Sequence, residues 1–84
     1  MRAEEVLPDA ADSVVRDGVT VRKGTVGAFL ANALAWGAPQ LDAAGRAAIE
    51  RDLADSLPAL RALRFFEVLE IRDPALRAFV AACQ

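Results

Sequence analysis

A cluster of residues around the only lysine has the composition of an anion-binding site. Arg22 and Lys23 precede Gly24, Thr25 and Gly27 in the stretch RKGTVG, which leads into an apolar run that is predicted to be a helix. Free amides at the start of a helix and the positive end of its dipole attract phosphate or carboxylate groups. Glycine lets such a group approach the backbone. The stretch is therefore a candidate site for an anionic ligand or a nucleotide phosphate.

The spacing of this stretch matches neither the P-loop nor the dinucleotide-binding fingerprint, so it carries no family signature. A structural interpretation is favoured over ligand binding. In that interpretation Gly24 turns the chain, Thr25 caps the following helix and Gly27 permits close packing between helices.

The composition leaves little room for catalysis. The chain has no histidine and no tyrosine, so a serine or cysteine nucleophile activated by histidine is excluded within it. Two carboxylate pairs, Glu67 with Glu70 and Asp52 with Asp55, are better explained as solvated faces. No zinc ligand set or calcium loop is present. We therefore expect a non-enzymatic protein with no cofactor and no bound metal.

Charge and hydropathy restrict the partners and the compartment. The net charge of −2 and the pI of about 5.0 argue against nucleic-acid binding. No signal peptide or membrane-spanning run is recognised, and the single Cys83 cannot form an internal disulfide. We expect a cytoplasmic protein without a membrane partner. Abundant alanine, with arginine as almost the sole basic residue, is typical of bacteria with GC-rich coding.

The first structural signal is a β-hairpin. Valine-rich segments flank Asp17 and Gly18, a pair that suits the positive φ angles of a two-residue type I′ turn. If Asp17 and Gly18 form the two-residue loop, the pairing of the two strands gives the hairpin one apolar and one mainly polar face. The apolar face has Val14, Val19 and Val21, and the polar face has Ser13, Val15, Thr20 and Arg22.

A strongly apolar helix follows over Thr25–Trp36. Gly37 marks its C-terminal end, and Pro39 prevents it from resuming. Apolar side chains cover well over half of its circumference, so we expect a central helix that is contacted on several sides.

Two more helices are predicted before the last third of the chain. One begins at Asp42, and its apolar residues recur every four positions: Ile49, Leu53 and Leu57. Two ion pairs are expected on its exposed side: Arg46 with Glu50 and Arg51 with Asp55. A short separate helix, SLPALRALR, is expected to be capped by Ser56, with Pro58 in its first turn.

The last third combines an ambiguous segment with a clear one. The partial alternation of Phe65 to Ile71 favours a strand, with a helical continuation as the alternative. Asp73 and Pro74 are typical of a helix start. The apolar residues of the closing helix then recur at helical spacing: Leu76, Phe79, Val80 and Cys83.

Together these patterns predict a small α+β domain over residues 13–84, with a flexible or loosely docked tail over residues 1–12. The expected order is two strands, three helices, an optional third strand and a final helix. The favoured function is a protein-interaction or accessory domain that binds a protein partner or forms a homodimer. Candidate contact residues are Trp36, Val15 and Thr20. The alternative is the anion site described above.

Overall fold

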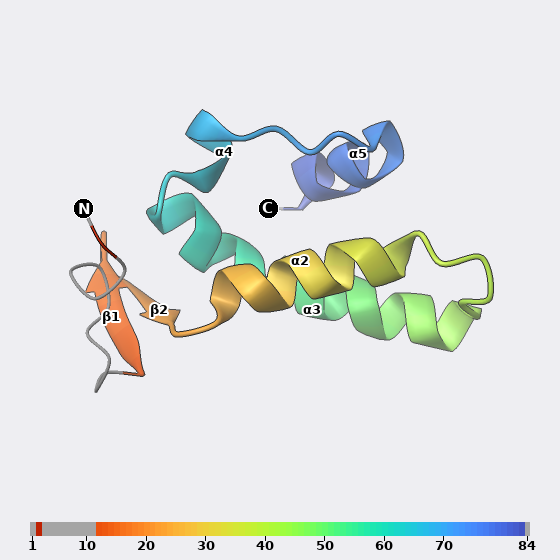
Figure 1. Ribbon diagram of the computed structural model, residues 1–84, viewed down its shortest axis with the longest axis horizontal. Coiled ribbons are helices and arrows are strands. Elements are labelled where there is room, and N and C mark those ends of the chain that lie inside the picture. Colours follow the sequence, from red (N-terminus) through yellow and green to blue (C-terminus); the bar gives the residue numbers. More distant parts are fainter. Residues whose placement is uncertain (1, 3–11, 84) are drawn as a thin grey trace.

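The computed structural model describes Arg2 and residues 12–83, so the tail predicted over residues 1–12 lies almost wholly outside the described residues. The elements, labelled as in Figure 1, are β1 (Ser13–Arg16), β2 (Val19–Arg22), α2 (Thr25–Trp36), α3 (Ala43–Ala62), α4 (Phe65–Val68) and α5 (Pro74–Ala82). This part of the chain is the predicted α+β domain, with a two-stranded antiparallel hairpin followed by four helices. The hairpin lies at one end, and α2 and α3 run side by side (Figure 1).

The hairpin has the predicted turn and register. Asp17 and Gly18 both have positive φ angles, 50° and 76°, and Val14 pairs with Val21. Val21 is buried, and β2 contacts α3, whereas Val15 on the opposite face is exposed. The valines of the apolar face therefore attach the ribbon to the helices.

Helix α2 has the predicted bounds but not the predicted cap. Gly24, at φ 90°, occupies the N-cap position, and no side chain caps the helix. The Thr25 hydroxyl instead donates a hydrogen bond to the carbonyl of Arg22, at 2.9 Å. The expectation that Thr25 caps the helix is wrong, because the left-handed glycine already turns the chain out of β2.

Helix α3 is one continuous helix of 20 residues, which corrects the prediction of a break near Pro58. Asp42 caps it as expected, since its carboxylate accepts a hydrogen bond from the Gly45 amide. Ser56 caps nothing; its hydroxyl donates to the carbonyl of Asp52. A proline inside a helix costs about 3 kcal/mol. The buried leucines on both sides of it, Leu57 and Leu60, offset this cost by packing into one core.

The segment Phe65–Ile71 is not a strand, so the favoured prediction is wrong. Arg64 adopts a left-handed conformation at φ 63°, which ends the register of α3 and starts the one-turn helix α4 in a new direction. A straight continuation of α3 would place Glu67 in its apolar stripe, but after the change of direction Glu67 pairs with Arg64 instead. Leu69 is extended but belongs to no sheet.

Helix α5 begins and packs as predicted. The Asp73 carboxylate accepts hydrogen bonds from the amides of Ala75 and Leu76, and Pro74 occupies the first turn. Leu76 and Val80 are buried.

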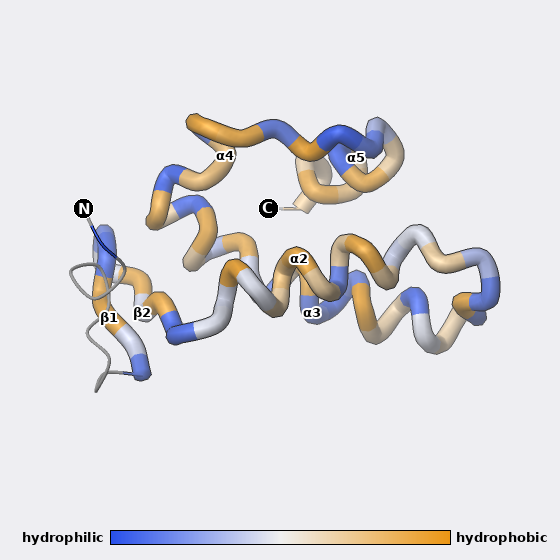
Figure 2. The backbone as a smooth tube through the Cα atoms, viewed as in Figure 1, coloured by the Kyte–Doolittle hydropathy of each residue, from blue (hydrophilic) through white to orange (hydrophobic). Residues whose placement is uncertain are grey.

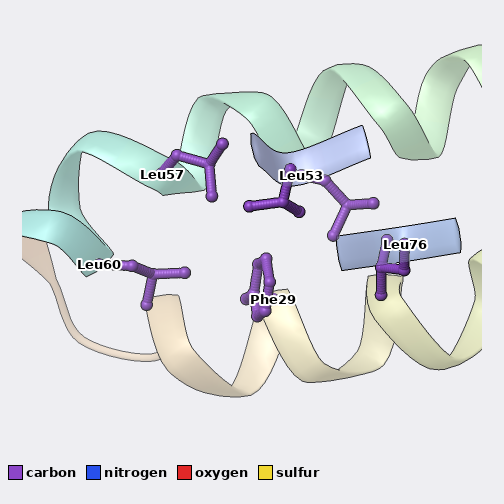
Figure 3. Packing of buried hydrophobic residues seen from close by; sticks show 6 residues of the cluster. Phe29, Leu53, Leu57, Leu60 and Leu76 are labelled. Atoms are coloured by element: carbon purple, nitrogen blue, oxygen red, sulfur yellow. The ribbon is translucent and has the colours of Figure 1, made fainter. Parts of the chain in front are cut away.

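The helices meet in one apolar core (Figure 3). Its buried members are Phe29 from α2, Leu53, Leu57 and Leu60 from α3, and Leu76 and Val80 from α5. The ring of Phe29 makes edge contacts with Phe65 and Phe66, at centroid distances of 6.3 and 6.0 Å. The core is thus built from one residue of α2, a leucine row of α3 and two residues of α5.

Replacing Gly18 by valine tests the turn. We expect Gly18→Val to lower the free energy of unfolding by about 1–3 kcal/mol, because valine is strained at positive φ. A built Cβ at this position has no neighbour within 4 Å, so the loss comes from backbone strain alone. Chemical denaturation measures it. Asparagine tolerates the left-handed region, so Gly18→Asn should have a free energy of unfolding close to that of the native protein. If Gly18→Val also had the native free energy of unfolding, the predicted turn would be contradicted.

Candidate functional site

Helix α2 exposes a large part of its apolar surface, contrary to the expectation that it is central. Phe29 is its only buried residue, while Leu30 is 50% exposed and Leu34 is 83% exposed. The helix contains no ionisable side chain, and its tube is mostly orange and pale in Figure 2. Helix α3 and the C-terminal segments cover one side of α2 and leave the other side to solvent.

An apolar groove of about 520 Å³ lies beside this exposed side. One wall comes from α2, through Leu30 and Leu34, and the other from the extended stretch around Leu69 and Ile71. Leu69 is itself 52% exposed. We call Leu30, Leu34, Leu69 and the groove between them the α2 surface.

A second hollow, of about 370 Å³, lies on the other side of the same extended stretch. It is lined by Phe66, Val80 and the side chains of Arg61 and Arg77. Both arginines are engaged within the chain: Arg61 donates to the carbonyl of Cys83, and Arg77 pairs with Glu70 at 2.8 Å. This hollow is therefore less suited than the α2 surface to an apolar partner.

Trp36 lies at the end of α2 and is half-buried. Its indole nitrogen donates to Glu50 Oε2 at 2.9 Å, and the Arg46 guanidinium stacks 4.8 Å from the ring centroid. The sequence suggested that Arg46 and Glu50 pair with each other; both instead contact the indole. Trp36 remains a predicted contact residue, although its N–H group is already satisfied within the chain.

The candidate anion site is assembled only in part. Arg22, Lys23 and Gly24 are exposed at the start of α2, and a built Cβ at Gly27 has no neighbour within 4 Å. Arg22 and Thr25 line a shallow hollow of about 230 Å³, but neither Lys23 nor the two glycines do. Asp55 from α3 lines it too, and its negative charge disfavours an anion.

The exposed face of the hairpin keeps the two contact residues predicted there. Val15 and Thr20 are paired across the strands, and both are exposed. They lie on the face opposite to Val21, which packs toward α3.

The glutamates that could have served as acid or base are engaged in ion pairs. Glu67 accepts hydrogen bonds from Arg64 at 2.7–3.0 Å, and this contact lowers the pKa of its carboxyl. A general acid at neutral pH needs the opposite shift. Glu70 pairs with Arg77. Within residues 12–83 and Arg2 there is no group of three or more potential metal ligands.

Comparison with known proteins adds no assignment. The chain matches no protein-family model, no curated protein and no solved structure. In the part of the chain that the structure describes, no helix has both the length and the apolar character needed to cross a membrane. The geometry of the α2 surface is therefore the main guide to function.

Sequence reasoning missed Leu30 and Leu34 of the α2 surface because it assigned the apolar residues of α2 to the core. A signal was present, since Gly27, Leu30, Ala31 and Leu34 share one face at positions i, i+3, i+4 and i+7.

The Arg64–Glu67 pair gives a pH prediction. The contact with Arg64 lowers the pKa of the Glu67 carboxyl in the folded chain. The pair therefore stabilises the fold at pH values above the unfolded-state pKa of Glu67, and this contribution is lost as the pH falls through the folded-state pKa of Glu67. The effect is small because both side chains are exposed. A carboxyl NMR titration should place Glu67 below the ordinary glutamate range. Arg64→Asn, which keeps the left-handed backbone, should return the midpoint toward that range; an unmoved midpoint would argue against the pair.

Proposed function

We propose that this chain is a small cytoplasmic, non-enzymatic domain that binds a protein partner, or itself, through the α2 surface. The observation that carries the proposal is Leu34, which is 83% exposed on a helix without any ionisable side chain. Contiguous apolar surface of this kind on a water-facing side is typical of a binding site for another protein.

The chemistry of the α2 surface suits an apolar anchor from a partner. Leu30 and Leu34 stand on one wall of the groove and Leu69 on the other, so an inserted side chain meets carbon on both sides. Full burial of an exposed leucine side chain makes the free energy of association more favourable by up to about 1.5–3 kcal/mol. Three partly exposed leucines therefore supply the core of an interface, and the polar side chains at the end of the groove, Glu70, Arg72 and Asp73, supply a rim.

The exposed hairpin face is a second proposed contact region within the same function. Val15 and Thr20 face solvent on a two-stranded sheet, and a strand edge can accept a partner strand.

Exchange of Leu34 for glutamate tests the α2 surface. We expect Leu34→Glu to abolish capture of partner proteins, or of tagged copies of the chain itself, because a carboxylate cannot be buried in an apolar groove. Capture from native lysate, scored by quantitative mass spectrometry, measures this. Val68→Glu is the matched control, since Val68 is 82% exposed and lines neither groove.

Both variants should keep the thermal midpoint of the native chain, because both positions face solvent. Equal capture by the native chain and Leu34→Glu, with Val15→Glu defective, would move the binding surface to the hairpin. Equal capture by all of these variants would contradict the proposal.

The alternative proposal is an anionic-ligand or nucleotide-phosphate site at the start of α2. It is supported by the exposed Arg22 and Lys23 beside a hollow that Arg22 and Thr25 line. Arg22→Ala combined with Lys23→Ala should then remove phosphate binding while the chain stays folded, as followed by amide NMR shifts on addition of phosphate and nucleotides. Asp55→Asn, which removes the opposing charge, should strengthen binding. Shifts that persist unchanged in the double variant would exclude this site.

A further inference from the structure

We propose that the exposed side of α2 binds the same side of a second copy of this chain, with the two helices antiparallel. The inference rests on the proposed function, since it names the partner of the α2 surface. It depends on four exposed residues of α2 that form a stripe: Gly27, Leu30, Ala31 and Leu34.

The stripe is continuous along one side of the helix. Residues at positions i, i+3, i+4 and i+7 lie one above the other, and all four members of the stripe are exposed, whereas Phe29 on another side of the helix is buried. Among the described residues, Gly27, Ala31 and Leu34 stay largely open, while Leu30 and Leu34 also border the groove whose other wall is the extended stretch.

The order of large and small residues makes the stripe complementary to itself. Its midpoint falls between Leu30 and Ala31. A two-fold axis through that point places Leu34 opposite Gly27 of the second copy, and Leu30 opposite Ala31 of the second copy. Each leucine then meets a small residue, and each such contact occurs twice, as in an isologous interface. A parallel helix in register would instead place leucine against leucine and glycine against glycine.

Nothing in the part of the chain that the structure describes explains why position 27 is a glycine. Glycine inside a helix is destabilising relative to alanine. A Cβ built at Gly27 meets nothing within 4 Å, and its φ angle is not positive, so neither close packing nor backbone conformation requires glycine here. A leucine from a second copy would occupy the space that a side chain at position 27 leaves open.

Electrostatics favour a second copy over a charged partner. Residues 25–36 carry no charge, so an acidic or basic helix would lose hydration without gaining an ion pair along the stripe. In the antiparallel pair, Arg22 and Lys23 come beside the C-terminal end of the other α2, which is the negative end of its dipole.

The size of the surface sets the expected strength. A helix of 12 residues is about 18 Å long, and one face of it offers less than the roughly 800 Å² per partner of a standard stable interface. We therefore expect a concentration-dependent dimer with a dissociation constant in roughly the micromolar range or weaker.

An exchange of sizes between positions 27 and 34 tests the arrangement. Sedimentation equilibrium over a concentration series should give masses between that of the 8.9 kDa chain and twice that value. Leu34→Ala should weaken the dimer about tenfold by removing the buried leucine. Gly27→Leu should weaken it comparably, because two leucines then collide; the monomer accepts this leucine since the space around Gly27 is open. The double variant, with both changes, should recover affinity close to that of the native chain.

Val68→Ala is the control of similar exposure and should leave the dimer unchanged. A dimer whose double variant is weaker than both single variants would overturn the antiparallel register. If the chain stays monomeric at millimolar concentration, the proposal that a second copy is the partner is wrong. Capture of other proteins that depends on Leu34 would then still support the proposed function. If no such capture is seen either, both proposals are wrong.

Discussion

The packing of Phe29 against the leucine row of α3 is the contact on which the rest of the described fold depends. Phe29 is the only buried residue of α2, and its ring also contacts Phe65 and Phe66, which follow directly after the turn at Arg64. One side chain therefore joins α2 to α3 and to the start of the C-terminal third. Leu76 and Val80 close the same cluster from α5.

This arrangement explains why an apolar surface remains outside. A core with one buried residue from α2 holds the helix along a single line, and among the described residues Gly27, Ala31 and Leu34 on another side of it stay exposed. Helix α2 thus has apolar side chains on two sides, one packed in the core and one exposed to solvent. By contrast, Glu67 and Glu70 in the last third are satisfied within the chain, since each is paired with an arginine, although Leu69 between them is exposed.

Local chemistry made much of the fold predictable. The Asp17–Gly18 turn, the caps at Asp42 and Asp73 and the alternation of the hairpin depend on residues close together in sequence, and the structure has all of them. The errors arose where distant packing prevails over local preference. Pro58 remains inside α3 because leucines on both sides of it reach one core, and Arg64 turns left-handed without glycine. The exposure of Leu30 and Leu34 depends on which distant segments pack against α2, which no local pattern records.

The contacts of Trp36 have an optical consequence. It is the only tryptophan, and the chain has no tyrosine, so the ultraviolet emission of the protein comes essentially from one indole. That indole is hydrogen-bonded to Glu50 and stacked under Arg46, and both of these residues belong to α3. Its emission therefore reports the separation of α2 from α3. Because Trp36 lies on the opposite side of α2 from Leu34, a molecule that occupies the open side leaves this signal largely unchanged, and loss of folding can be followed independently of association.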